Sequence, residues 1–121
     1  MTYILGLSAF YHDSSATLIK DGKILWALQE ERFSRIKHDP SFPSKSIKFI
    51  LKEENIKLID INYIVFYEKP FLKFERLLET HIAFAPTGFK SFAASIPIWI
   101  REKLFQKQKI FKELKKIDLS F

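Results

Sequence analysis

The side chains best suited to chemistry lie in two polar runs, each after a strand-like apolar segment. The first run holds His12 and Asp13, directly after the largely apolar residues 4–10. An imidazole titrates near neutral pH and a neighbouring carboxylate raises its pKa, so the pair suits acid–base catalysis or substrate binding. The alternative is a turn shaped by hydrogen bonds from Asp13 and Ser14 to the backbone. Ser14 and Ser15 would let a phosphate or carbonyl group approach backbone amides, but they are equally ordinary turn residues.

The second polar run covers residues 29–43 and mixes cationic and acidic groups. A connection of this length without regular structure is uncommon in a compact domain and is often functional. Arginine can clamp an anionic group with two hydrogen bonds and lysine can add a point charge, so a phosphate is one candidate ligand. A solvated, salt-bridged loop is the other interpretation. The groups concerned are Arg32, Arg35, Lys37, His38 and Lys45, with Glu30, Glu31 and Asp39 as the acids.

Several classes of site are excluded or disfavoured by the sequence. There is no cysteine, so disulfides, zinc–thiolate sites and thiol nucleophiles are impossible. The three histidines, His12, His38 and His81, lack the i, i+4 spacing that presents two metal ligands on one helical face. We therefore predict no metal site in this chain and a partly buried structural role for His81. No Walker-type loop, Rossmann fingerprint or Gly-x-Ser-x-Gly elbow is present.

The composition indicates one packed domain or part of one. The chain has 121 residues, of which 47% are hydrophobic and 16% aromatic, which argues against disorder. Much of the net charge of +6 lies in residues 101–116, which hold seven basic and two acidic side chains. This segment is a candidate for binding a membrane surface or nucleic acid, but an amphipathic helix with its lysines in water is the commoner explanation. Without a signal-peptide pattern or a long apolar run, a cytoplasmic location is expected.

The spacing of apolar residues predicts an α/β fold with the order βββαβαα. Strands are expected at residues 3–8, 16–20 and 23–28, with Asp21-Gly22 as a tight hairpin turn. A helix capped by Ser44 should run to about Asn55, followed by a largely buried strand at residues 62–67. A helix over residues 70–83 and a long one over 91–114, kinked near Pro97, complete the pattern. Residues 117–121 look like the start of another strand, which should leave an unpaired sheet edge and a hydrophobic patch.

This order brings the two polar runs together. In a meander the first and third strands point the same way, and a helical crossover lays the fourth parallel to the first. The carboxyl ends of these three strands then share one edge of a mixed sheet, the edge where open α/β sheets bind ligands. That edge would carry residues 11–13, 30–39 and 68–69. We therefore expect His12 and His38 to face one cleft.

The two polar runs also resemble the N-terminal region of the O-carbamoyltransferases of the nodulation-protein and antibiotic-tailoring type. The first motif is Ile-Leu-Gly-Leu-Ser-Ala-Phe-Tyr-His-Asp-Ser-Ser-Ala at residues 4–16. The second is Gln-Glu-Glu-Arg-Phe-Ser-Arg-Ile-Lys-His-Asp at residues 29–39, followed by Phe42-Pro43. Two long motifs in this order and separation make the resemblance specific. It extends over the whole chain, as an incomplete N-terminal portion of such an enzyme.

The resemblance implies an enzyme that moves a carbamoyl group from carbamoyl phosphate to a hydroxyl of a small molecule, with ATP forming a carbamoyl-adenylate. It implies that residues 1–121 are the first part of an actin-like ATPase (ribonuclease H-like) domain, partnered by the C-terminal remainder of the enzyme. The iron of the full-length family depends on a His-His-x-x-His-Ala type motif, which does not occur here. The alternative is a non-catalytic module whose basic residues 99–116 dock on an acidic partner or nucleic acid.

The resemblance also implies roles for individual residues. His12 would be the acid/base or acceptor-positioning residue, with Asp13 tuning it. Substrate or nucleotide groups would be bound by the remaining candidates, with Glu30 orienting the others; these are Ser14, Ser15, Glu30, Arg32, Lys37 and His38. The chain alone is expected to be inactive, because the second domain that activates the carbamoyl donor is missing.

Overall fold

The structure is a computed structural model that describes residues 1–68, 70–99 and 105–119. The chain divides into two compact units, which are described separately. The sheet unit comprises Met1–Tyr67 and Lys112–Phe121, and the helical unit comprises Glu68–Phe111. The candidate site residues all lie in the sheet unit.

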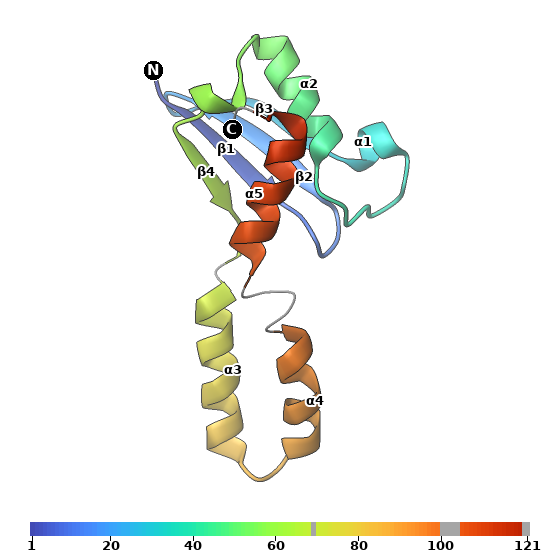
Figure 1. Ribbon diagram of the computed structural model, residues 1–121, viewed down its shortest axis with the longest axis vertical. Helices are drawn as coiled ribbons and strands as arrows, with labels where there is room; N and C mark the ends of the chain where they lie inside the picture. Colours follow the sequence, from blue (N-terminus) through green and yellow to red (C-terminus); the bar gives the residue numbers. More distant parts are fainter. Residues whose placement is uncertain (69, 100–104, 120–121) are drawn as a thin grey trace. The chain divides into compact units, whose positions relative to one another are not determined.

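A four-stranded mixed sheet forms the centre of the sheet unit (Figure 1). Its strands are β1 (Tyr3–Ser8), β2 (Ser15–Lys20), β3 (Lys23–Gln29) and β4 (Tyr63–Phe66), in the order β3-β2-β1-β4. The first three strands form an antiparallel meander and β4 runs parallel to β1. The predicted strands, meander and parallel crossover are therefore confirmed.

The hairpin between β2 and β3 turns at the predicted dipeptide. Asp21 and Gly22 have φ of 48° and 81°, the left-handed values that a tight two-residue turn requires. The Asp21 side chain accepts a hydrogen bond from the Thr2 amide at 2.8 Å, which ties the turn to the start of β1.

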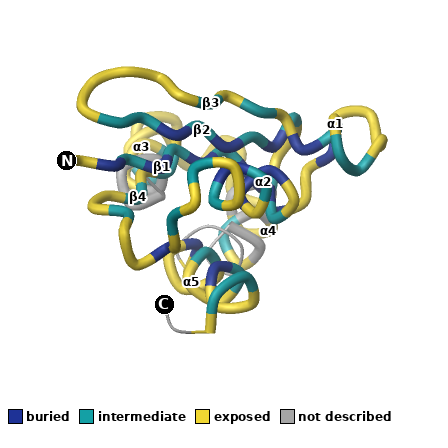
Figure 2. The backbone as a smooth tube through the Cα atoms, turned by 90° about the horizontal axis from the view of Figure 1, so that it is seen from above, coloured by how far each residue is buried: buried dark blue, intermediate teal, exposed yellow. Residues whose placement is uncertain are grey.

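The hydrophobic core lies on one face of the sheet, beneath helix α2 (Ser44–Glu54). Residues of β1 and β2 alternate in burial (Figure 2). Leu5 and Leu18 on this face have no exposed surface. Ile47 and Ile50 of α2 are equally buried against β2 and β3. Each such side chain contributes roughly 1.5–3 kcal/mol through burial, so this layer dominates the stability of the sheet unit.

Helix α2 ends as predicted but begins differently. Asn55 terminates it in the left-handed conformation, with φ of 52°. Ser44 is the first helical residue rather than the cap, and the preceding Pro43 offers no side-chain cap. The prediction of Ser44 as the N-cap is therefore wrong, because the amides of this helix end are satisfied by the distant Glu30.

Other expectations need correction in the sheet unit. The run from residue 30 to 43 was expected to lack regular structure, but it contains a short helix, α1 (Glu31–Ser34). A 3₁₀ turn, η1 (Leu58–Asp60), precedes β4. Strand β4 is not largely buried, since its outer face is exposed. Residues 117–119 continue or follow a helix instead of starting a strand, and residues 120–121 lie outside the described part.

The helical unit holds α3 (Pro70–Phe84), α4 (Phe89–Trp99) and the first half of α5 (Gln106–Ile117). The helix beginning at Pro70 and the break at residues 85–88 are confirmed. In place of one long helix over residues 91–114, the structure has α4 and α5, and the intervening residues 100–104 lie outside the described part. In the described residues, no helix combines the length and the apolar character needed to cross a bilayer.

Candidate functional site

Two loops meet at the carboxyl end of β1 and are joined through their backbones. The Phe10 amide donates to the Pro40 carbonyl at 2.8 Å, and the Ser14 amide donates to the Asp39 carbonyl at 3.0 Å. The Glu30 amide in turn donates to the Ser14 carbonyl at 2.8 Å. The tip between β1 and β2 is thus fixed to the connection that follows β3, as the strand order predicted.

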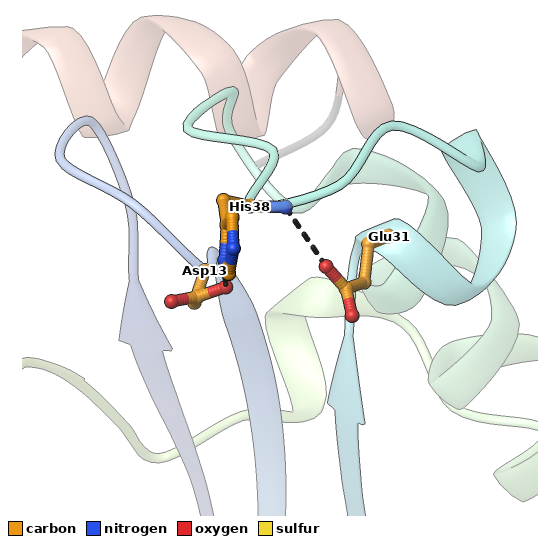
Figure 3. Close-up of side chains that lie close together, drawn as sticks. All are labelled: Asp13, Glu31 and His38. Atoms are coloured by element: carbon orange, nitrogen blue, oxygen red, sulfur yellow. Dashed lines mark hydrogen bonds and ion pairs between the residues drawn. The ribbon is translucent and has the colours of Figure 1, made fainter.

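Asp13 lies between the two imidazoles of these loops. Its Oδ2 is 2.8 Å from Nδ1 of His12, and its Oδ1 is 2.8 Å from Nδ1 of His38 (Figure 3 shows the His38 side). The backbone amide of His38 donates to Oε2 of Glu31 at 2.9 Å, which fixes the loop that carries this imidazole. The expected proximity of His12 and His38 is confirmed, whereas the expected cleft that both would face stays a prediction. The predicted pair of His12 and Asp13 is therefore one side of a His12–Asp13–His38 cluster.

Backbone conformation holds the cluster in place. Asp13 and His38 have φ of 50° and 57°, a region that non-glycine residues adopt at a cost of order 1–3 kcal/mol unless their surroundings determine it. The hydrogen bonds between the two loops hold both residues in this conformation. Both imidazole side chains are well exposed, at 59% for His12 and 62% for His38, so they are accessible to a ligand.

The electrostatics of the cluster favour an ionised Asp13. Hydrogen bonds from His38 and His12 lower the pKa of Asp13 below its usual value. The hydrogen bond and charge of Asp13 raise the pKa of His38. An ionised carboxylate only accepts hydrogen bonds, so Nδ1 of each imidazole carries the proton and points at Asp13. This arrangement leaves Nε2 of each ring for a ligand.

Glu30 is placed as a buried structural carboxylate. It is 3% exposed, and its oxygens accept hydrogen bonds from the amide of Lys45, the amide of Ser46 and the hydroxyl of Ser46, at 3.2, 2.9 and 3.0 Å. A carboxylate at the N-terminus of α2 also complements the helix dipole. Its link to the cluster runs through its own amide, which holds Ser14.

Asp39 is a second buried acid in the same loop. Hydrogen bonds from Ser34 and Ser41 lower its pKa, and its carboxylate is 2.6 Å from the Ser41 hydroxyl. Sequence reasoning gave it no role, although an acid two residues before a serine at a Pro-Ser turn is a recognisable signal for this kind of local bond.

The remaining candidates divide into exposed cations and buried hydroxyls. Arg32 and Lys37 line an open hollow together with Glu31 and Arg35, next to the loop of His38. Ser14 is 1% exposed and its hydroxyl has no partner among the described residues, while Ser15 opens β2 and is partly buried. The third expected member of the edge, residues 68–69, stays a prediction, since Glu68 belongs to the helical unit and Lys69 lies outside the described residues.

The cluster was tested for its fit to a metal ion. Asp13, Glu31 and His38 each offer a ligand atom, and these atoms lie within 4.8 Å of one another. However, Nδ1 of His38 is committed to Asp13, and Oε2 of Glu31 is committed to the amide of His38. A metal bound through those two atoms would have to replace both hydrogen bonds. The His-His-x-x-His-Ala type motif that the resemblance gives for iron does not occur in the sequence, so the iron of the family is not assigned to these residues.

Comparison with known protein families identifies the family of this chain. The carbamoyltransferase N-terminus family matches residues 3–120. The chain belongs to that family. The carbamoyltransferase resemblance seen in the two motifs is thereby confirmed, and the match covers both loops of the site and the whole sheet.

Relatives of this family member occur in distant organisms. An uncharacterized protein of Synechocystis, sll1178, is 57% identical over 94% of this chain, which corresponds to 18% of that protein. The nodulation protein NolNO of Sinorhizobium fredii is 40% identical over 50% of this chain and 9% of its own length. An uncharacterized protein of Methanocaldococcus jannaschii, MJ1051, is 45% identical over 44% of this chain and 10% of its own length. The chain thus spans less than a fifth of each of these three relatives.

Proposed function

We propose that this chain supplies the acid–base and anion-binding part of a carbamoyltransferase site. In this proposal a carbamoyl group passes from carbamoyl phosphate, through an ATP-derived carbamoyl-adenylate, to a hydroxyl of a small-molecule acceptor. Family membership supports the reaction class. The observation that carries the assignment to residues is Asp13, which accepts hydrogen bonds from both His12 and His38 at 2.8 Å.

His12 is the proposed general base. Because Asp13 holds the proton on Nδ1, the lone pair of Nε2 is free to accept the proton of the acceptor hydroxyl. As the hydroxyl oxygen forms a bond to the carbamoyl carbon, its proton passes to Nε2 of His12. The bond from that carbon to the adenylate phosphate oxygen breaks, and AMP leaves with the electron pair. Asp13 stabilises the imidazolium that results.

His38 and the exposed cations are the proposed anion-binding groups. A raised pKa keeps more of His38 protonated near neutral pH, so its Nε2 can donate to a phosphate or carbamoyl oxygen. Arg32 and Lys37 line the hollow beside it and can offset further negative charge. Glu30, Ser14 and Ser15 act on this site by positioning the loops.

The strand order supports an actin-like ATPase architecture as part of the proposal. In an open α/β sheet, ligands bind at the carboxyl ends of the strands, beside a crossover. Here β4 joins the sheet parallel to β1 by a helical crossover, and the cluster follows the carboxyl end of β1. ATP and the C-terminal remainder of the enzyme are the proposed cosubstrate and partner of this edge.

The alternative of a binding module built on the basic residues 99–116 receives less support. In the described part of this segment, Leu114 is 1% exposed, whereas Lys107, Lys109, Lys115 and Lys116 are exposed. Phe105 and Phe111 of the same segment are 54% and 45% exposed, so the buried contact of the helix is centred on Leu114. A buried leucine flanked by lysines in solvent is the pattern of a scaffold helix.

Turnover of a chimera tests the proposed base. In the chimera, this chain replaces the matching stretch of the Synechocystis relative, and the assay follows ATP- and carbamoyl-phosphate-dependent carbamoylation of a panel of hydroxyl compounds. His12→Ala should lower turnover by roughly 10²-fold or more, as expected for loss of a general base. His81→Ala, in the helical unit, is the matched control and should leave turnover unchanged. Equal activity of the two variants would remove His12 from the mechanism.

A further inference from the structure

The sheet has one covered face and one open face. Trp26 of β3 points to the covered face, where its ring packs edge-on against Phe49 of α2, with centroids 5.3 Å apart. Leu18 pairs with Trp26 and lies on the same face with no exposed surface. Residues one position away along β1 and β2 point the other way, and a register shift opposite Leu18 and Ile19 pairs Ile24, two positions from Trp26, with Ile19 on that other face. On that open face, Ile24, Tyr63 and Val65 are 70%, 63% and 52% exposed.

The open face carries an apolar row that crosses all four strands. Tyr63 of β4 pairs with Ile4 of β1, which pairs with Ile19 of β2, which pairs with Ile24 of β3. Four large apolar side chains therefore stand side by side, and Val65 extends the row along β4. The strip is exposed at Ile24, Tyr63 and Val65 and partly exposed at Ile4 and Ile19. A contiguous apolar strip of this kind marks an interaction surface, whereas singly exposed apolar residues need no explanation.

The character of the open face changes toward the candidate site. The next row toward the carboxyl end of β1 contains Gly6 and Thr17, and the row after it contains Ser8, Ser15 and Gln29. The apolar strip thus lies at the end of the sheet away from the His12–Asp13–His38 cluster. An element docked on the strip would leave the edge that carries the cluster open.

The lengths of the relatives indicate what covers the strip. The region matched by this chain is 18% of the Synechocystis relative, so more than four-fifths of that protein lies outside the matched region. The matching family is the N-terminus of carbamoyltransferases, and an N-terminal region of that kind is joined to the rest of its enzyme. We infer that the strip formed by Ile4, Ile19, Ile24, Tyr63 and Val65 docks an apolar element from the part of the carbamoyltransferase polypeptide outside this matched region. The inference rests on family membership and on burial, and it is independent of the role proposed for His12.

Cysteine labelling tests the inference, because this chain contains no cysteine of its own. Single variants Ile24→Cys and Val65→Cys are made in the isolated chain and in the chimera with the Synechocystis relative. Ile59→Cys is the matched control, since Ile59 is 67% exposed but lies in η1, outside the sheet. The rate of alkylation at each engineered position is followed by peptide mass spectrometry.

The inference predicts fast labelling of all three variants in the isolated chain. In the chimera, labelling of Ile24→Cys and Val65→Cys should slow by at least about tenfold, because burial removes the thiol from the reagent, while Ile59→Cys keeps its rate. Equal rates in the two proteins would overturn the inference. Protection already present in the isolated chain would also overturn it, because a second copy or the helical unit would then be the occupant.

Discussion

Removal of the Glu30 carboxylate should destabilise the sheet unit strongly, although this residue was expected to act on substrate. In Glu30→Ala, the two amides at the start of α2 and the hydroxyl of Ser46 lose their acceptor in a buried setting. Loss of a helix cap costs about 1 kcal/mol. Loss of a charged partner by a buried hydroxyl adds about 2 kcal/mol. The free energy of unfolding should therefore fall by about 3 kcal/mol, a large part of the 5–15 kcal/mol typical of a domain.

Urea denaturation followed by far-UV circular dichroism and by tryptophan fluorescence measures this loss. Trp26 is a suitable reporter, because its Nε1 donates to Glu54 of α2 at 2.9 Å. Glu30→Gln keeps an acceptor oxygen at the same place and should cost only about 1 kcal/mol. Glu53→Ala, on the exposed side of α2, is the control and should change stability by less than about 0.5 kcal/mol. A cost for Glu30→Ala no larger than that of the control would refute the assignment of Glu30 as the cap.

Four further predictions follow from the site and its supports. Asp13→Asn should lower the pKa of His38 in an NMR titration; an unaltered pKa of His38 would contradict the pairing. The pKa of Asp13 is lowered from 3.8 and that of His38 is raised from 6.5, so both groups are charged in the folded chain between these values. The difference in unfolding free energy between the native chain and Asp13→Asn should therefore be largest between pH 3.8 and 6.5 and should shrink at lower and higher pH. A difference that does not change with pH would contradict this prediction. Leu114→Ala should cost about 2–5 kcal/mol in urea melts while Lys115→Ala costs less than about 0.5 kcal/mol, and similar costs would refute the scaffold role of α5. The isolated chain should neither bind iron by elemental analysis nor transfer carbamoyl groups, and stoichiometric iron or turnover would show that the site is misplaced.

The sheet and the meeting of its loops were predictable because they follow from local and topological rules. The Asp21-Gly22 turn and the helical crossover fix strand directions, and strand directions fix which polar runs share an edge. The proximity of His12 to His38 could be predicted from the strand order alone, without the conformations of the side chains. The part that sequence could not supply is the bridging role of Asp13, because it depends on left-handed backbone at Asp13 and on bonds between the loops.

The errors share a physical cause, which is competition from tertiary partners. Ser44 has the composition of a helix cap, yet the carboxylate of Glu30, fourteen positions earlier, takes the amides at this end of the helix. Strand β4 was predicted to be buried because its residues are apolar, but Tyr63 and Val65 on its outer face are exposed. The apolar patch was predicted for the wrong reason, since it lies on the face of the sheet and not at a strand beginning at Ile117.

The most direct test of the central claim is a titration of the isolated chain with carbamoyl phosphate, followed through the imidazole signals of its three histidines by NMR. The account predicts that the signals of His12 and His38 shift together and saturably, while that of His81 in the helical unit does not move. Lys37→Ala should weaken the binding without changing the fold. Shifts confined to His81, or no saturable shift at His12 and His38, would contradict the assignment of this cluster as the carbamoyl site.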